Sequence, residues 1–167
     1  MKTIVFATLL CLSLQAQEVY FSPRGGCTDA IVREIGKAKT EVLVQAYSFT
    51  SEPIAQALAA AKKRGVQVEA VIDKGQLKRS AAPILEAAKI KVVWDGKHAI
   101  AHNKIVIVDR KVVLTGSFNF SAGAETRNAE NLLVLHDPEL ARRYATNWVG
   151  HASHSMPRPV VSPKHAP

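Results

Sequence analysis

The 167-residue sequence has few cysteines and few aromatic residues. With two cysteines and an aromatic content of 6%, it has no disulfide framework, so its stability has to come from a packed core. No internal repeat is visible, and no Asp/Glu cluster of the kind that holds two metal ions stands out. The chain is long enough for one domain, and 47% apolar and 22% charged residues are ordinary globular values.

Acidic residues are scarce relative to basic ones, at 14 against 22, which gives a formal net charge of +8. This balance favours an acidic partner, with nucleic acid first and an anionic membrane surface second. Neither an amphipathic membrane helix nor a large apolar loop is apparent, so no stable membrane association is expected.

Residues 1–16 are typical of a signal peptide. Lys2 supplies the positive start, residues 4–14 are mostly apolar, and Ala16 is a small residue where cleavage would fall. A periplasmic or secreted location follows from this interpretation. Cleavage would leave Cys27 as the only cysteine, either as an inert thiol or as an intersubunit bridge.

Strands and helices alternate along the first half of the remaining chain, which predicts an α/β layered sheet with helices on both faces. The final helix has Asp137 as N-cap and a buried stripe of Leu140, Tyr144 and Trp148. Strands are expected over residues 18–22, 41–49, 66–72, 92–94, 104–109, 112–116 and 131–136, and helices over residues 28–38, 52–64, 80–89 and from 138 onward. The domain spans residues 17–150, and residues 151–167 are expected to be a Pro-rich, basic, disordered tail.

One motif carries most of the chemical information. Its pattern is H-x-K-x4-D-x6-G-S-x-N, and it comprises His102, Lys104, Asp109, Gly116, Ser117 and Asn119. Because side chains alternate along a strand, His102 and Lys104 point to the same side and can face one phosphate together. Asp109 points to the other side and is expected to be structural, pairing with a cation or capping the turn that follows it. Lys104, Ser117 and Asn119 are expected to bind the phosphate oxygens.

The motif resembles the signature of the phospholipase D superfamily. The resemblance implies a mixed central sheet flanked by helices, and cleavage of phosphodiesters through a phosphohistidine on His102. It also implies that Glu130 binds the other nitrogen of His102 and orients the ring. The short chain with one motif copy is most similar to the small periplasmic endonucleases of that family.

Family chemistry uses two motifs, whereas this chain has one, so a homodimer that shares one central site is expected. We therefore expect a sequence-nonspecific endonuclease on DNA, with RNA as a further substrate and with no metal or cofactor. Two alternatives remain open. One is a lipid phosphodiesterase or phosphatidyltransferase, and the other is a nucleic-acid-binding module without catalysis.

Other histidines and aromatic residues are given simpler interpretations. His98 and His102 have the spacing of a helical zinc pair, but Gly96 and the neighbouring strands argue against a helix there. His151 and His154 are expected to be solvated at the edge of the tail. Aromatic side chains near the motif are expected either to stack on bases or to pack in the core; they are Tyr47, Phe49 and Phe118.

Overall fold

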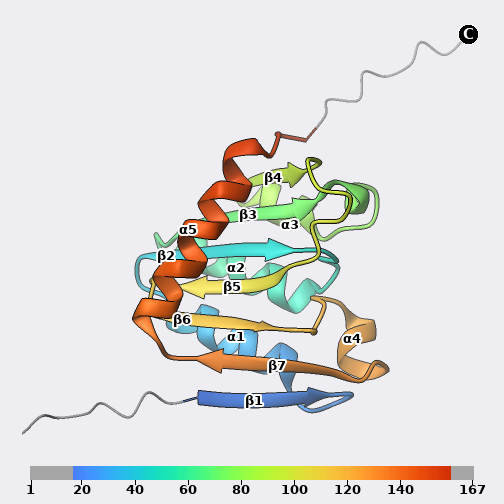
Figure 1. The fold of residues 1–167 in the computed structure, drawn as a ribbon, viewed down its shortest axis with the longest axis vertical. Coiled ribbons are helices and arrows are strands. Elements are labelled where there is room, and N and C mark those ends of the chain that lie inside the picture. Colours follow the sequence, from blue (N-terminus) through green and yellow to red (C-terminus); the bar gives the residue numbers. More distant parts are fainter. Residues whose placement is uncertain (1–16, 159–167) are drawn as a thin grey trace, which may run out of the picture.

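A computed structural model describes residues 17–158 of the chain as one seven-stranded mixed sheet with five α-helices (Figure 1). The predicted signal peptide and the end of the predicted tail lie outside these residues. The strand order is β1-β7-β6-β5-β2-β3-β4. The strands are β1 (Gln17–Ser22), β2 (Glu41–Ala46), β3 (Gln67–Asp73), β4 (Lys91–Asp95), β5 (Lys104–Val108), β6 (Val112–Gly116) and β7 (Glu130–Leu135).

The sheet changes character at its centre. β2, β3 and β4 are parallel, and α2 (Glu52–Lys63) and α3 (Ala82–Ala87) make the connections between them. β5 pairs antiparallel with β2, and β6, β7 and β1 continue the antiparallel half. The ends of β2, β3, β4 and β6 therefore meet the starts of β5 and β7 at one edge of the sheet, which we call the site edge.

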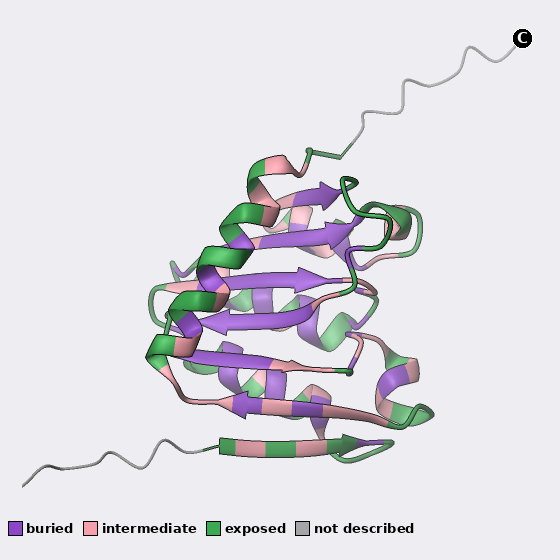
Figure 2. Cartoon of the chain, viewed as in Figure 1, coloured by how far each residue is buried: buried purple, intermediate pink, exposed green. Residues whose placement is uncertain are grey.

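Helices cover both faces, which confirms the predicted α/β architecture. α1 (Cys27–Lys37), α2 and α3 lie on one face, and α5 (Pro138–His154) crosses the other face (Figure 1). Each face has its own apolar cluster, and the central strands between them are buried (Figure 2). No helix in residues 17–158 combines the length and the apolar character needed to cross a membrane.

The final helix differs from expectation in its length and its buried face. It extends to His154, past the expected domain end at residue 150. Asp137 caps it as predicted, accepting hydrogen bonds from the amides of Glu139 and Leu140. The buried stripe is Ala141, Ala145 and Trp148, while Leu140 and Tyr144 are half-buried. Small alanines let the helix lie close to the sheet, which leaves the larger side chains at its flanks.

The first helix is capped by a distant residue. The sequence predicts Thr28 or Asp29 as its N-cap, but the helix begins at Cys27 after Gly26, which has a φ of 81°. The carboxylate of Glu125, in the short helix α4 (Ala122–Thr126), accepts from the amides of Thr28 at 2.8 Å and Gly26 at 3.3 Å. A long-range carboxylate thus does the work of a local cap.

Asp109 lies at the end of β5 opposite the site edge. It follows Lys104 by five positions, or about 17 Å along a strand. Its carboxylate accepts hydrogen bonds of 2.8–3.2 Å from the amides of residues 39–41 and from the hydroxyl of Thr40. Asp109 therefore binds the α1–β2 connection and the start of β2. The sequence instead predicted that it would pair with a cation or cap the turn that follows it.

Burial opposes the ionisation of Asp109, but hydrogen bonds from the amides of Glu41, Thr40 and Lys39 outweigh it and hold the pKa of this carboxyl below its usual range. Replacing Asp109 with Asn should lower the free energy of unfolding at neutral pH by about 2 kcal/mol, because an amide cannot accept all these bonds. Urea denaturation measures this loss. The exposed Asp29, replaced by Asn, is the matched control and should change little.

The difference in the free energy of unfolding between the wild type and Asp109→Asn should depend on pH. Since the folded-state pKa of Asp109 is lowered, its stabilisation is complete above the ordinary Asp pKa of about 4 and disappears as pH falls through the folded value. The deficit of Asp109→Asn should therefore shrink in acid. A stable Asp109→Asn protein without activity would contradict the structural role.

Candidate active site

The residues of the motif, Asp109 excepted, gather at the site edge. His102 and Lys104 stand at the start of β5, Gly116 to Asn119 follow β6, and Glu130 begins β7. Because β5 and β6 form a hairpin, the two halves of the motif come from adjacent strands. The strand directions thus bring together residues up to 28 positions apart in the sequence.

Lys104 is buried beneath His102. The Lys104 side chain is only 6% exposed, and its Nζ donates to the backbone oxygen of His102 at 2.6 Å. Nζ also lies 5.4 Å from the centre of the Tyr47 ring, and that ring lies 4.6 Å from the exposed imidazole of His102. The lysine therefore supplies a positive charge that is fixed by the backbone of His102 and by the tyrosine ring that the imidazole also contacts.

Burial lowers the pKa of Lys104, and the negative charge of Glu130 partly offsets this effect. A dry cation interacts more strongly with an anion than a solvated one does, because less water screens it. Lys104 is therefore well placed to neutralise a phosphate that binds beside His102.

The segment after β6 presents small polar groups. Ser117 is exposed, and its Oγ accepts from the amide of Asn131 at 3.0 Å, which leaves its hydroxyl hydrogen to donate elsewhere. Asn119 is half-buried, and its Oδ1 has no hydrogen-bond partner among the described residues. Ser117 can thus donate to a phosphate at this edge, whereas Oδ1 of Asn119 can only accept, so that phosphate binding by Ser117 and Asn119 stays a prediction.

Glu130 makes a contact that the resemblance does not imply. Its carboxylate accepts from the side chain of Asn128 at 3.1 Å, and within the described chain no hydrogen bond joins it to His102. Its electrostatic effect on Lys104 nevertheless places it close to the site. Orientation of His102 by Glu130 stays a prediction.

Two residues contribute to the site in ways that the sequence did not predict. Asp73, at the end of β3, accepts from the amides of Ala101 and Gly75, both at 2.8 Å, and so fixes the chain just before His102. Tyr47 was expected only as a base-stacking or packing residue, yet it contacts both His102 and Lys104. A carboxylate at the end of a parallel strand is the signal that could have indicated Asp73.

Other candidate residues lie in the core. Phe49 and Phe118 are fully buried, so they pack and do not stack on bases. Cys27 is fully buried as well, and burial, with a smaller effect from Glu125, raises the pKa of its thiol to about 11. This agrees with an inert thiol and argues against an intersubunit bridge.

Comparison with known families identifies this arrangement. A family model described as cardiolipin synthase, PLD-like domain, matches residues 31–149. The chain belongs to this PLD-like family. The match includes the sheet from β2 to β7 and the whole site edge from Tyr47 to Glu130.

Curated relatives of this chain are named for activity on lipids. The phospholipase D of Rickettsia conorii is 43% identical over 140 residues, which are 83% of this chain and 70% of that protein. The mitochondrial cardiolipin hydrolase of Mus musculus is 30% identical over 116 residues, which are 68% of this chain and 52% of that protein.

Among solved structures, Nuc from Salmonella typhimurium, described as a phospholipase D family member, superposes with a TM-score of 0.81 at 37% identity, covering 86% of this chain and 97% of that one. NucT from Helicobacter pylori has a TM-score of 0.77 at 22% identity and shares the fold. The chain is thus a phosphodiesterase of the phospholipase D superfamily, which confirms the resemblance read from the motif.

Gly116 gives a test of how tightly the site segment is built. Its φ is 152°, and a Cβ there would lie 2.2 Å from the backbone oxygen of Asn131. Gly116→Ala should therefore displace Ser117 and lower the free energy of unfolding by about 2 kcal/mol or more. Thermal melting measures the loss.

The matched control is Gly36→Ala in α1, where φ is not positive and no atom lies within 4 Å of the added Cβ. This change should leave stability unchanged or raise it, because alanine favours a helix more than glycine does. Equal behaviour of the two variants would contradict the steric argument at Gly116.

Proposed function

We propose that this chain is an exported, metal-independent endonuclease that cleaves DNA, and RNA as a further substrate, without sequence preference. The observation that carries the proposal is an exposed imidazole, His102, and a buried cation, Lys104, which both contact the Tyr47 ring at an open edge of the sheet. The net charge of +8 favours a polyanionic substrate. Export rests on the predicted signal peptide alone.

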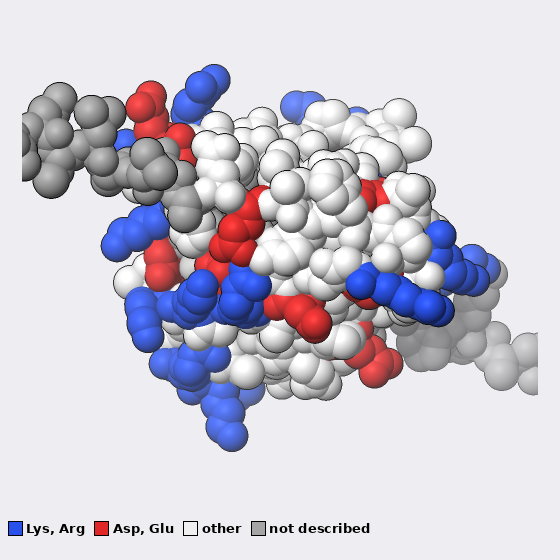
Figure 3. All heavy atoms as spheres, turned by 90° about the horizontal axis from the view of Figure 1, so that it is seen from below, with Lys and Arg blue, Asp and Glu red and all other residues white. Residues whose placement is uncertain are grey.

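Basic side chains near the site edge can contact a long anionic substrate. Viewed from the β1 side, a smaller group of Lys and Arg side chains lies toward the site edge and a larger group lies at the opposite ends of the strands, with acidic side chains between them (Figure 3). Near the site edge, Lys78 and Arg79 line a hollow together with Thr50. The amide of Thr50 in turn bonds the oxygen of Phe120, next to Asn119. Glu52 also lines this hollow, but the two cations outnumber it, so the hollow suits contacts with the flanking phosphates of a nucleic acid.

The proposed reaction has two steps. The neutral imidazole of His102 attacks phosphorus, the bond from phosphorus to the leaving oxygen breaks, and an acid protonates that oxygen. Water then attacks the phosphohistidine, gives a proton to the same acid in its base form, and frees His102. Lys104, Ser117 and Asn119 bind the non-bridging oxygens in both steps, and Glu130 orients the imidazole.

The acid has to come from elsewhere, because one chain offers a single His102. In-line displacement places the attacking and protonating groups on opposite sides of phosphorus. A twofold axis through the site supplies both from one gene, so we propose a homodimer with a shared site.

Lipid phosphodiesterase activity is the second candidate, favoured by the names of the Rickettsia and mouse relatives. A direct comparison of substrates separates the two. The purified protein is offered plasmid DNA, RNA and phosphatidylcholine vesicles in parallel, with EDTA and at moderate temperature. We expect cleavage of nucleic acid in EDTA and little release of headgroup, because Lys104 already supplies the charge that a metal would bring.

Hydrolysis of the lipid alone would overturn the nuclease proposal in favour of the second candidate. Activity lost in EDTA while the protein stays folded, and restored by Mg²⁺, would overturn metal independence. Tight DNA binding without cleavage would instead favour the non-catalytic binding module.

The shared site is tested with a mixed dimer. Wild-type chain and a His102→Asn chain with a different tag are co-expressed, and the dimer that carries both tags is purified. Independent subunits would keep about half of the wild-type activity. A shared site predicts a loss of at least about 100-fold, because nucleophile and acid are both needed. His136→Asn, at the other edge of the sheet, is the control partner and should preserve activity.

A further inference from the structure

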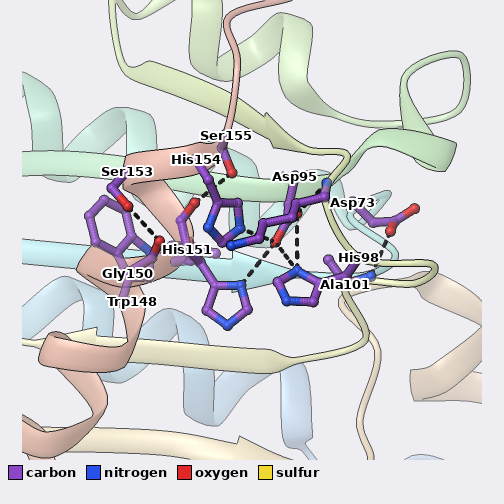
Figure 4. Close-up of polar contacts among 12 residues, drawn as sticks. Asp73, Asp95, His98, Ala101, Trp148, Gly150, His151, Ser153, His154 and Ser155 are labelled. Atoms are coloured by element: carbon purple, nitrogen blue, oxygen red, sulfur yellow. Dashed lines mark hydrogen bonds and ion pairs between the residues drawn. The ribbon is translucent and has the colours of Figure 1, made fainter.

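Four potential metal ligands converge at the top of the sheet, outside the candidate active site (Figure 4). Asp95 ends β4, and its side chain is completely buried. His98 follows in the loop before β5, and His151 and His154 stand in the last turn of α5. The expectation that the two helix histidines are solvated is therefore wrong, since their side chains are only 16% and 22% exposed.

Three imidazoles point at the same carboxylate oxygen. Oδ2 of Asp95 lies 3.0 Å from Nδ1 of His98, 2.9 Å from Nδ1 of His151 and 3.3 Å from Nε2 of His154. The other oxygen, Oδ1, accepts from the amide of Lys97 at 3.1 Å and also lies 3.2 Å from Nδ1 of His98. Four donors thus surround one buried carboxylate, and three of them are ring nitrogens that converge on Oδ2, which has about two lone pairs.

The distances fit a tetrahedral metal site. Zinc binds His nitrogen and carboxylate oxygen at 2.0–2.2 Å, which places neighbouring ligand atoms about 3.3 Å apart. The three oxygen–nitrogen distances fall at or just below this value. All four ligand atoms lie within 4.8 Å of one another, so small rotations of the imidazoles would bring the nitrogens to the spacing that an ion requires. Imidazole with one carboxylate is a donor set that suits zinc and its neighbours and does not suit magnesium or calcium.

We propose that Asp95, His98, His151 and His154 form a structural site for Zn²⁺. All four positions of the tetrahedron come from the protein, as in structural sites and unlike catalytic ones, which keep a position for water. The side chain of His98 is 43% exposed, which gives the ion a path from solvent. The site requires no change in the proposed reaction.

Zinc here would join two parts of the chain that are 56 residues apart in sequence. It would tie the end of α5 to the loop that reaches His102 four residues after His98. Asp73 already holds Ala101 in the same loop. The ion would therefore stabilise both the helix end and the approach to the active site.

A second group of this kind is a weaker candidate and serves as the control. Glu18, Glu34 and His136 also lie close together. Their carboxylates, however, are already paired with Arg33 and Lys37. Because those charges are compensated, we expect no zinc there.

The test uses the purified full-length protein, stripped with EDTA and dialysed. Calorimetric titration with ZnCl₂ should show one ion per chain, elemental analysis should find it retained, and the melting temperature should rise. Co²⁺ in place of zinc should give the intense visible absorption of a tetrahedral site. Mg²⁺ should neither bind in the titration nor raise the melting temperature.

His98→Ala and His151→Ala should each weaken zinc binding at least about 10-fold. Both should fold, since two backbone hydrogen bonds between Trp94 and Met156 and the bond from Trp148 to Val44 still hold the helix end. His136→Ala should bind zinc like the wild type. Absence of zinc binding by the wild type, or unchanged binding by both site variants, would overturn the proposal. Neither readout depends on catalytic activity, so the outcome is separate from that of the nuclease assay.

Discussion

The antiparallel pairing of β5 with β2 is the constraint on which the rest of the site depends. In a fully parallel sheet, the start of β5 would lie at the opposite edge from the ends of β2 and β3. Reversal at the centre instead sets Lys104 against Ala46 and places His102 beside Tyr47. The hairpin to β6 then returns Ser117 to the same edge. One change of strand direction thus assembles the site from three strands.

The buried charge of Lys104 is only partly compensated by the residues around it. A buried cation is costly unless its hydrogen bonds are satisfied and an opposite charge is near. Lys104 has the carbonyl of His102 and the face of Tyr47 as partners, and the negative charge of Glu130 acts on it. This compensation is incomplete, because the pKa of Lys104 is still lowered. An arriving phosphate would complete it, so the fold favours anion binding at this point.

Local patterns in the sequence were enough to predict most of the fold. Alternation and capping signals located the strands, the hairpin at Arg110 and the cap at Asp137 within a few residues. The sequence also placed Lys104 correctly at the start of a strand, with His102 in the segment just before it. Strand 41–49 was predicted too long, because the pairing with β3 and β5 ends at Ala46 and the chain turns away.

Contacts between distant segments were beyond such patterns. The cap of α1 by Glu125 joins residues 97 positions apart, and the bond from His151 to Asp95 joins residues 56 apart. Neither has a local signal, since each depends on where a separate element packs. The bonds from Asp109 to residues 39–41 are of the same kind: the motif marked the residue, but only the packed sheet shows its partner.

The two halves of the active site are held to different degrees, and this determines where motion can occur. On one side, the amide of Ala101 is bound by the buried carboxylate of Asp73, and the amide of Tyr47 by the oxygen of Asn103. His102 is therefore flanked by fixed backbone. On the other side, the backbone is anchored as well, since the amide of Glu130 donates to the hydroxyl of Ser22, but the partner of the Glu130 carboxylate is the exposed Asn128. Nucleophile and lysine are thus preorganised, whereas the carboxylate expected to orient His102 has only an exposed side-chain contact to give up when a substrate or a second subunit binds.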